Sequence, residues 1–447
     1  MFKTITAALV ASPIALSTAV GSALANGDDL TPIEELGQEI FFDRKLSLLR
    51  NQSCASCHVP EAGWVGDDPR INEAGAVYEG SIPGEFGNRK PPSSAYASLA
   101  PLFDADFAED PDDPLFVGGN FWDGRATGWK LGNPAADQAQ GPFLNPVEQA
   151  LPDAACVVYR VCEGTYGDLF DTVWAEACMI DWPGNGIVNQ QCVKSDGEVP
   201  LAEEERTKVE STYDLIALAV AAFEGSAVSN AFTSKLDAVR AGLASFTEQE
   251  AEGRDIFRGT GMCVACHIGS PPSGPAPLLT DFTYDNLGVP RNPLNPFSIA
   301  NPDWADPGLA GFLETIADYA PYAEANLGKH KVPTLRNVGL GSCEAQELAG
   351  LPPANCITKA YMHNGYFKSL WQVVHFYNTR DVKDSCESMG IFDATADVAL
   401  ESNCWPAPEV TDNVNTDELG NLGLTLEEEE ALVAFMLTMS DGYLVGQ

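Results

Sequence analysis

The amino-acid sequence predicts a mostly α-helical protein built from two large domains. Strict alternation of apolar and polar residues, the pattern of a half-buried strand, is scarce along the chain. A helical segment near the start of the chain is repeated close to residue 250. The 447 residues exceed the size of one typical domain and suit two. Stretches rich in Gly, Pro, Asp and Asn, such as 104–114 and 292–306, predict long loops between the helices.

The repeated segment has the features of a capped helix. The first copy is TPIEELGQEIF at 31–41 and the second is TEQEAEGRDIF at 247–257, and the two align without a gap. In each copy, a threonine is followed three residues later by a glutamate, which is the pattern of a capping box. Pro32 adds a residue favoured in the first helical turn. Duplication of one domain is the simplest explanation, and it predicts a boundary just before Phe246.

A C-x-x-C-H motif follows each copy of this helix. The two motifs are Cys54-Ala-Ser-Cys57-His58 and Cys263-Val-Ala-Cys266-His267. The spacing is typical of c-type haem attachment, because two thiols add to the vinyl groups of one porphyrin and the adjacent imidazole then ligates its iron. A zinc site would need neighbouring ligands that neither motif offers. The sequence therefore predicts two cytochrome c-like haem domains, two covalently bound haem c groups, and His58 and His267 as iron ligands.

The first 25 residues have the features of a secretory signal. Lys3 precedes an apolar stretch at 5–20, and Ala23-Leu24-Ala25 forms an A-x-A cleavage site. We therefore expect cleavage after Ala25 and a periplasmic mature protein, divided into one haem c domain at 26–245 and a second at 246–447. Association with the cell surface stays open. The apolar segment at 213–223 is too short and too closely flanked by charges to span a membrane, so we expect a buried helix that closes the first domain.

The chain is strongly acidic, with a formal net charge of −39. Loss of the signal would remove one positive charge, that of Lys3, and leave the mature chain one unit more negative. This charge makes nucleic acid and anionic membrane surfaces poor partners. It favours a basic redox protein as a partner, although acidity that only maintains solubility is an equally good explanation. The acidic run at 104–113 is interpreted as a solvated loop rather than a cation site.

Eight of the twelve cysteines lie outside the C-x-x-C-H motifs. They fall in two groups, at 156–192 and 343–404, which suggests up to four disulfides that staple loop-rich segments in an exported protein. The simplest hypothesis pairs neighbours along the chain. It predicts the pairs Cys156–Cys162, Cys178–Cys192, Cys343–Cys356 and Cys386–Cys404.

Histidines are few, and their positions constrain the coordination of the two irons. The chain contains only His58, His267, His330, His363 and His375. No histidine lies between His58 and His267, so the first haem lacks a second imidazole in its own domain and is expected to keep an open sixth position. A small oxidant such as hydrogen peroxide can bind an open iron. A non-enzymatic dihaem electron-transfer cytochrome, the alternative of another class, would instead close both axes of each iron.

The chain resembles the bacterial dihaem cytochrome c peroxidases and their MauG-like relatives over nearly the whole mature sequence. The blocks that carry the resemblance are FWDGRA at 121–126, QAQGP at 138–142, NPVE at 145–148, KVPTLRN at 331–337 and YMHNG at 361–365. The resemblance implies that the domain at 26–245 is peroxidatic, that the domain at 246–447 transfers electrons, and that the haems lie near the interdomain interface. It also implies reduction of hydrogen peroxide with electrons from a small c-type cytochrome or cupredoxin. The MauG-like alternative is oxidation of Tyr or Trp side chains of a partner protein. A dimer is left open.

The resemblance also assigns candidate catalytic residues. Glu148, the glutamate of N-P-V-E, takes the place above the peroxidatic haem, where a carboxylate with a raised pKa could move a proton between the two peroxide oxygens. Gln138 matches a second distal polar residue that orients peroxide or water. Trp122 matches the aromatic residue that lies between the two haems in this family. Without the resemblance, a Phe-Trp pair would more often be interpreted as part of a packed core. Arg89, Arg125 and Arg336 fall in blocks that neutralise haem propionates or hold interdomain contacts.

Two further expectations concern metal ligands in the second domain. Tyr377 lies fourteen residues after His363, where MauG-like members place a tyrosine that ligates the second haem iron. His375 is the rival ligand, but residues two apart on a helix point to different faces. Family members often hold calcium between the domains, and the matching positions are Lys90, Thr358 and Ala360. A lysine replaces the side-chain ligand there, so calcium is doubtful even though the carbonyls of Thr358 and Ala360 could still serve.

Overall fold

The computed structural model describes residues 30–108, 114–270, 274–350 and 356–445. The predicted signal peptide at 1–25 and part of the acidic run lie outside these residues. The α-helices are α1 (Pro32–Phe42), α2 (Pro69–Glu73), α3 (Pro134–Leu144), α4 (Ala154–Cys162), α5 (Gly167–Val173), α6 (Asn185–Gln191), α7 (Glu203–Gly225), α8 (Lys235–Arg240), α9 (Glu248–Arg258), α10 (Pro296–Ala300), α11 (Leu309–Leu313), α12 (Cys343–Leu348), α13 (Leu370–Thr379), α14 (Ala396–Glu401) and α15 (Leu426–Leu437). The strands are β1 (Asp104–Asp106), β2 (Leu115–Val117), β3 (Tyr284–Asp285), β4 (His330–Lys331), β5 (Asp384–Ser385) and β6 (Cys404–Trp405).

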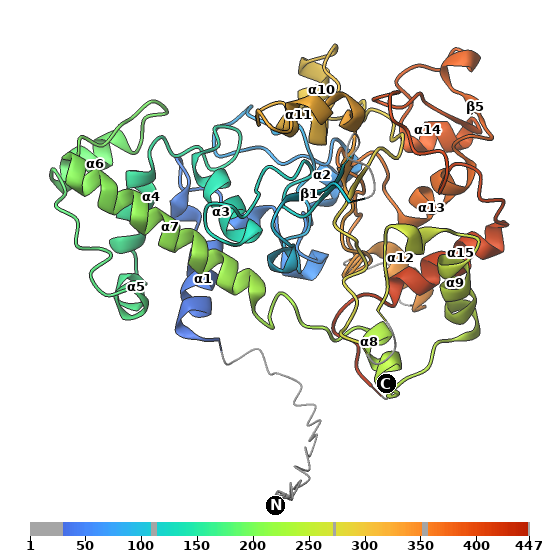
Figure 1. Ribbon diagram of the computed structural model, residues 1–447, viewed down its shortest axis with the longest axis horizontal. Helices are drawn as coiled ribbons and strands as arrows, with labels where there is room; N and C mark the ends of the chain where they lie inside the picture. The colour runs from blue at the N-terminus through green and yellow to red at the C-terminus, as the bar shows by residue number, and fades with distance from the viewer. Residues whose placement is uncertain (1–29, 109–113, 271–273, 351–355, 446–447) are drawn as a thin grey trace, which may run out of the picture.

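Helices are the main regular secondary structure of the described residues, strands are few and short, and long loops connect these elements. The strands form three separate pairs: β1–β2 and β3–β4 are antiparallel, and β5–β6 is parallel. Helices α1 and α3–α7 gather in one half of the molecule, and α8, α9 and α12–α15 gather in the other (Figure 1). The loops, α2, α10, α11 and the β1–β2 pair lie between the two groups. No described helix is both long and apolar enough to span a membrane.

The two repeated segments form the two predicted helices, α1 and α9. In α1 the backbone N–H of Thr31 donates to the carboxylate of Glu34 at 2.7 Å. In α9 the backbone N–H of Thr247 donates to Glu250 at 2.7 Å, and the N–H of Glu250 donates back to the Thr247 hydroxyl at 3.2 Å. These contacts satisfy N–H groups that have no partner within a helix. Each helix leads into a short 3₁₀ turn that carries one C-x-x-C-H motif.

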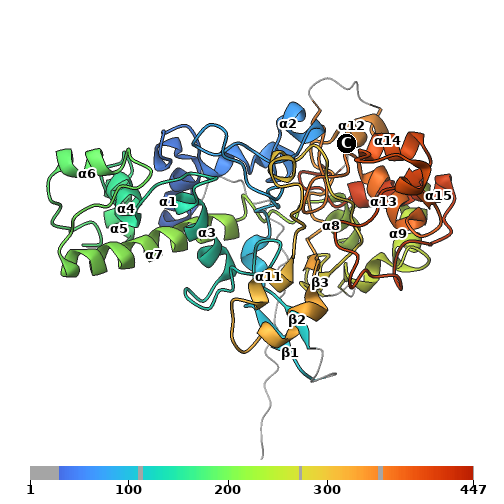
Figure 2. The same ribbon diagram turned by 90° about the horizontal axis from the view of Figure 1, so that it is seen from above.

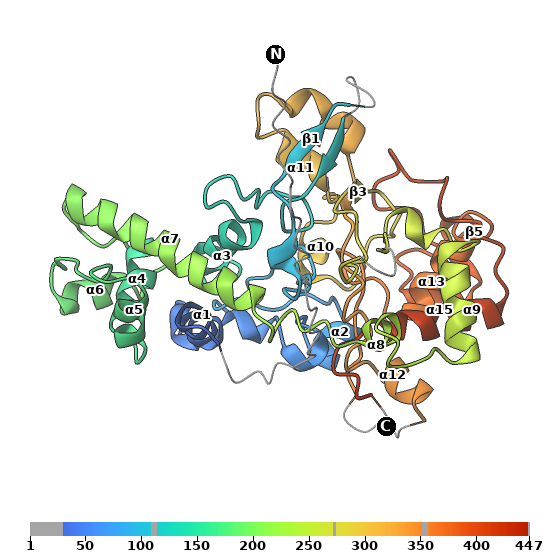
Figure 3. The ribbon, with the colours of Figure 1, turned by 60° about the horizontal axis from the view of Figure 1, so that its bottom comes forward.

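The helix pairs α1–α7 and α9–α15 repeat one packing arrangement (Figure 3). Gly37 of α1 lies against the backbone carbonyl of Ala219 on α7, so closely that a Cβ atom would overlap it. Gly253 of α9 lies in the same way against the carbonyl of Ala431 on α15. The absence of a side chain at these glycines therefore allows both close approaches.

An aromatic pair follows one helical turn beyond each glycine contact. The rings of Phe41 and Phe223 lie 5.4 Å apart between α1 and α7, and those of Phe257 and Phe435 lie 5.4 Å apart between α9 and α15. The predicted helix at 213–223 lies within α7, and Phe223 is fully buried. Each half thus has its own apolar core around the same type of helix pair.

The disulfides confirm two predicted pairs and correct two others. Cys343–Cys356 and Cys386–Cys404 are paired as expected. The first group instead pairs Cys156 with Cys192 and Cys162 with Cys178. Neighbour pairing was wrong here because Cys156 and Cys162 lie on one helix, α4. Six residues along a helix separate Cα atoms by about 9 Å, whereas a disulfide needs less than about 7 Å.

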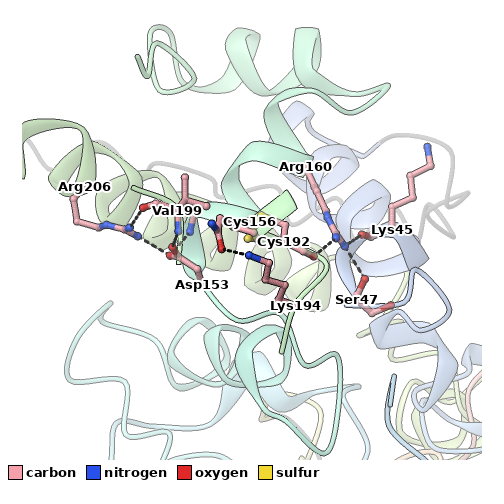
Figure 4. Close-up of a disulfide and its surroundings, with 11 residues drawn as sticks. Lys45, Ser47, Asp153, Cys156, Arg160, Cys192, Lys194, Val199 and Arg206 are labelled. Atoms are coloured by element: carbon pink, nitrogen blue, oxygen red, sulfur yellow. Dashed lines mark hydrogen bonds and ion pairs between the residues drawn. A yellow bond between two sulfur atoms is a disulfide. The ribbon is translucent and has the colours of Figure 1, made fainter. Parts of the chain in front are cut away.

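The Cys156–Cys192 disulfide fastens the end of α6 to α4 beside a buried arginine (Figure 4). The guanidinium of Arg160 donates to the carbonyls of Lys45, Ser47 and Cys192 at 2.6–2.8 Å. Figure 2 shows α4–α6 at the outer end of the first half, away from the second half. The two bridges of this group therefore stabilise a peripheral segment.

Candidate active site

Each C-x-x-C-H motif lines a separate cavity. The first cavity is lined by Cys54, Cys57 and His58, and it includes Gln138 and Glu148 in its wall. The second cavity is lined by Cys263, Cys266 and His267, together with Tyr377. The two cavities share five lining residues: Trp122, Lys331, Val332, Pro333 and Thr334. They are therefore neighbours on either side of a thin wall.

Both motif histidines are oriented in the way that a metal-binding imidazole requires. The Nδ1 atom of His58 lies 3.1 Å from the carbonyl oxygen of Trp64, and that of His267 lies 2.8 Å from the carbonyl of Leu279. An Nδ1–H that donates to a carbonyl leaves the Nε2 lone pair free for a metal. Burial lowers the pKa of His58 to about 4 and also lowers that of His267, which keeps both rings neutral.

The four motif cysteines are thiols, whereas the other eight cysteines are paired in disulfides. Burial raises the pKa of Cys57 and of Cys263 to about 12, so neither is poised as a reactive thiolate. Two protonated thiols beside a neutral imidazole, all lining a cavity, fit a haem c group. The donor sets present in both cavities therefore match the predicted cofactor.

The wall of the first cavity carries a buried carboxyl group. Glu148 lies in the loop after α3, and its carboxylate accepts a hydrogen bond from the Asn145 side-chain amide at 2.9 Å. Burial raises the pKa of Glu148, while the positive charge of Arg125 opposes the rise. Gln138, on α3, lies in the same wall. Among the described residues that line this cavity, His58 is the only histidine and there is no methionine.

A second buried carboxyl group in this cavity was missed in the sequence analysis. Glu224, in the last turn of α7, lines the first cavity and is 4% exposed. Burial raises its pKa to about 8. The only sequence signal was that Glu224 comes directly after the apolar run that ends at Phe223. A charged residue at such a position is normally expected to reach solvent, so a buried site was not predicted.

Trp122 is fixed in the wall between the cavities. Its indole N–H donates to the carbonyl of Lys90 at 2.8 Å, and its own carbonyl accepts from the backbone N–H of Lys331 at 2.8 Å. Its ring lies 6.5 Å from that of His363. The side chain therefore contacts both halves of the molecule and faces both cavities.

The three candidate arginines occupy different positions. Arg89 lines the first cavity and bridges Asp123 and Asp306, with N–O distances of 2.6 Å to each. Arg125 also lines this cavity, pairs with Asp123 at 2.6 Å and lies over the Phe121 ring.

Arg336 is not among the lining residues of either cavity. Its guanidinium pairs with Asp237 at 2.9 Å and lies over the rings of Tyr96 and Phe232. Because Tyr96 belongs to the first half of the chain and Arg336 to the second, the contact between them connects the two halves.

Tyr377 and His375 lie on the same helix, α13, but only Tyr377 lines the second cavity. The Nδ1 atom of His375 lies 2.9 Å from Glu429, and its Nε2 atom lies 2.7 Å from the Lys383 ammonium nitrogen. Burial raises the pKa of Tyr377, so a phenolate there requires a nearby positive charge. Of the two rivals, Tyr377 is therefore the one placed beside the motif histidine His267.

Asp306, His330 and His363 bring three metal-ligand atoms within 4.8 Å of one another in the second cavity. The two imidazole rings stack with centroids 3.7 Å apart. Both oxygens of Asp306, however, accept hydrogen bonds from Arg89 at 2.6 and 2.7 Å. Because this carboxylate is already neutralised, the cluster is a poor site for a further cation.

The residues at the family's calcium position do not fit calcium. Lys90 is buried there, and the carbonyl of Thr358 accepts a hydrogen bond from the Asn72 side chain at 2.9 Å. The Lys359 ammonium donates to the carbonyls of Ala62, Asn337 and Leu340 at 2.8–3.3 Å. The buried Ala360 completes this segment. The Thr358 carbonyl therefore already has a hydrogen-bond donor, and two ammonium groups lie in or next to this segment.

Comparisons with known proteins agree with this arrangement. The family model described as di-haem cytochrome c peroxidase matches residues 32–245. The methylamine utilization protein MauG of Paracoccus denitrificans is 32% identical over 413 residues, covering 91% of this chain and 88% of that protein. The cytochrome c551 peroxidase of Nitrosomonas europaea is 26% identical and covers 83% of each chain.

Solved structures show the same relationship. The diheme peroxidase BthA from Burkholderia thailandensis superposes with a TM-score of 0.65 and 26% sequence identity, covering 92% of this chain and 89% of that chain. The extent and level of identity to MauG, together with the family match, establish the class of protein. The chain belongs to the di-haem cytochrome c peroxidase and MauG family, and it is a dihaem peroxidase-type oxidoreductase.

Proposed function

We propose that the protein reduces hydrogen peroxide to water in the periplasm, with electrons from a small c-type cytochrome or cupredoxin. The reaction takes place in the first cavity, at a haem c attached through Cys54 and Cys57 and ligated by His58. The observation that carries the proposal is the wall of this cavity, where Glu148 and Gln138 accompany a single histidine. The described lining residues include one imidazole and no methionine, so a haem iron held by His58 would be left accessible to peroxide.

A second haem c would be held in the second cavity by Cys263, Cys266, His267 and Tyr377, which all line it. The peroxidatic domain is residues 26–245 and the electron-transfer domain is residues 246–447. The repeated helix pairs support this division, because α1–α7 and α9–α15 each adjoin one motif. The wall shared by the cavities supports haems placed near the interface between the domains.

A haem c held by Cys54, Cys57 and His58 would supply the redox chemistry for peroxide in the first cavity. Glu148 would accept a proton from one peroxide oxygen and return it to the other, which leaves as water. The raised pKa of this buried carboxyl group suits both halves of the transfer. Gln138 orients peroxide by hydrogen bonding. In the complete reaction, one peroxide, two electrons and two protons give two molecules of water.

Trp122 and Arg89 act between the two cavities, Trp122 in electron transfer and Arg89 in holding the two halves together. The Trp122 indole shortens the distance that an electron must cross, because its ring belongs to both cavity walls. Arg89 holds Asp123 of the first half and Asp306 of the second half in one ion-pair network. This network fixes the relative position of the domains that carry the two haems.

A second function is favoured by Tyr377 and by the 32% identity to MauG. In that mode the oxidising equivalents are withdrawn from Tyr or Trp side chains of a partner protein. A phenolate ligand favours this chemistry, because it stabilises the oxidised state of the second iron. The two modes share peroxide activation by Glu148 and differ only in the source of electrons.

The direct test measures peroxide reduction by the holoenzyme with a reduced small cytochrome as donor. Glu148→Gln keeps the size of the side chain but removes the proton acceptor, so kcat/KM for peroxide should fall by about 10²–10⁴-fold. The matched control is Glu210→Gln, at an exposed position on α7, which should leave the rate unchanged. Full activity in the Glu148 variant would contradict the proposal. Peroxide activation without oxidation of the cytochrome would favour the second mode.

A further inference from the structure

A cluster of aromatic side chains connects the wall between the two cavities with the protein surface. The β1–β2 pair of the first half and α11 of the second half lie side by side at the junction of the two halves (Figures 2 and 3). Their buried apolar residues form one core, with Phe103, Phe116 and Tyr284 at its centre. Neither the family match nor the cavities described above assign a role to this cluster.

The inner end of the cluster is Tyr284, on β3. It is 6% exposed and lies opposite Lys331 in the β3–β4 pair, and Lys331 lines both cavities. Its neighbour Asp285 lines the second cavity, and Phe282 lines the first. The Tyr284 hydroxyl lies directly against Gly124, two residues from Trp122. Tyr284 itself lines neither cavity, but it adjoins Lys331, which lines both.

Phe103 connects Tyr284 with the outer rings. Its ring centroid lies 6.1 Å from that of Tyr284, 6.0 Å from that of Trp129 and 6.1 Å from that of Tyr319. Trp129 and Tyr319 are 6.3 Å apart. Each step is an ordinary contact between aromatic rings. The rings thus form a continuous path without an intervening aliphatic side chain.

The outer end of the path is Trp129, which is 51% exposed. Its indole N–H donates to the carbonyl of Phe103 at 2.8 Å, so the exposed ring is held in one orientation. Core packing explains the buried phenylalanines but does not require a half-exposed tryptophan at the end of the cluster. Burial raises the pKa of Tyr319, and the negative charges of Asp104 and Asp318 add to the rise. Negative charges stabilise a cationic oxidised indole by the same electrostatics.

We propose that Trp129 is a surface redox site, connected to the haem cavities through Tyr284 and Phe103, where oxidising equivalents from peroxide are exchanged with a one-electron reductant outside the protein. This inference rests on the proposed function of the first cavity. The Trp129 indole loses one electron and becomes a radical cation. This electron consumes one of the two oxidising equivalents that peroxide supplies. An external reductant then returns the electron. The phenol proton of Tyr284 stays in its hydrogen bond to the Gly118 carbonyl.

Without a reductant, Trp129 itself is consumed. It loses a second electron and gains one oxygen atom from water, with release of two protons. Together with peroxide reduction, the sum is one tryptophan and one hydrogen peroxide giving one hydroxytryptophan and one water. The reaction leaves a permanent mark at the proposed site.

The test treats the oxidised holoenzyme with a few equivalents of hydrogen peroxide and no donor, and then maps tryptophan oxidation by peptide mass spectrometry. Trp129 should gain oxygen, whereas Trp182, which packs on Tyr159 in the peripheral α4 segment, should not. Trp129→Phe should prolong the peroxide-oxidised optical state severalfold, and Trp182→Phe should not. Unmodified Trp129, or an unchanged lifetime in the Trp129 variant, would overturn the proposal.

Two further measurements distinguish failure of this inference from failure of the proposed function. Modification of Trp129 that persists in Glu148→Gln would reveal direct attack by peroxide and would also overturn the inference. Turnover of peroxide with a reduced cytochrome is measured in the same wild-type sample. If turnover is normal and Trp129 is unmodified, the surface redox site fails while the peroxidase survives. If turnover is absent as well, the proposed function itself fails.

Discussion

Glu148 has two properties that a proton-transfer group in peroxide cleavage requires. It lies in the wall of the first cavity, and burial raises its pKa. It can accept the peroxide proton only when ionised, so the rate should fall as the pH drops through its pKa. We predict an acid limb of kcat/KM above the usual glutamate pKa of about 4.3.

The pH profile of kcat/KM for peroxide checks this prediction. The acid limb should disappear in Glu148→Gln, which has no titrating group at that position. The residual activity of that variant should be flat with pH over the same range. An acid limb of unchanged position in the variant would assign the titration to another group, such as Glu224.

Tyr377 is the residue that should set the spectrum of the second haem. Tyr377→Phe removes the ligand atom, so the low-energy absorption and the reduction potential of this haem should change, with the potential rising as phenolate is lost. Met362 lines the same cavity, so Met362→Leu is the matched control and should leave both the absorption and the potential unchanged. Spectra that respond to Met362→Leu and not to Tyr377→Phe would contradict the assignment.

The predictability of single residues depended on whether a local pattern fixed their chemistry. The C-x-x-C-H motifs predicted Cys54 and His58 as haem-binding residues, because attachment and ligation need adjacent residues, and both line the first cavity. Glu224 was missed, because nothing in its local sequence shows that the end of α7 meets a cavity. The role of Arg336 was left between two alternatives, because its partner Asp237 is distant in sequence.

Helices were predictable because their signals are local, whereas their partners were not. The capping boxes at Thr31 and Thr247 marked the starts of α1 and α9. The sequence did not reveal that α7 and α15 pack on these helices, because the contact depends on Ala219 and Ala431, which carry no distinctive pattern. The same limitation explains the two wrong disulfides, because α4 held Cys156 and Cys162 too far apart.

The close approach of α1 to α7 gives a prediction at this scale. Gly37→Ala would place a Cβ atom on the Ala219 carbonyl, and a backbone group cannot rotate away. Overpacking of this kind should lower the free energy of unfolding by about 1–3 kcal/mol. The matched control is Gly186→Ala in α6, where nothing lies within 4 Å of the added atom.

Denaturant unfolding of both glycine variants checks this prediction. Because alanine restricts the unfolded chain, the Gly186 variant should gain about 0.4–1 kcal/mol or stay unchanged. Equal effects of the two substitutions would mean that helix propensity, and not the contact with α7, determines the stability at Gly37.

At the scale of the whole molecule, the Arg89 network joins the two halves. Arg89→Gln would leave Asp123 and Asp306 buried without their shared cation, which should cost about 3–5 kcal/mol. Arg254→Gln, at a pair with the exposed Asp255, should cost about 0–1 kcal/mol. Denaturant unfolding of the two variants measures these effects. Similar unfolding midpoints would show that the network does not hold the halves together.

The central claim is that the first haem of the fully oxidised protein has an open iron position with Glu148 beside it. The most direct measurement adds stoichiometric hydrogen peroxide to the oxidised holoenzyme and follows the Soret absorbance in the first seconds. We predict an immediate change in the wild-type protein and a much slower one in Glu148→Gln. A silent spectrum that becomes reactive only after one-electron reduction would contradict the claim, because it would show that a sixth ligand closes this iron in the oxidised state.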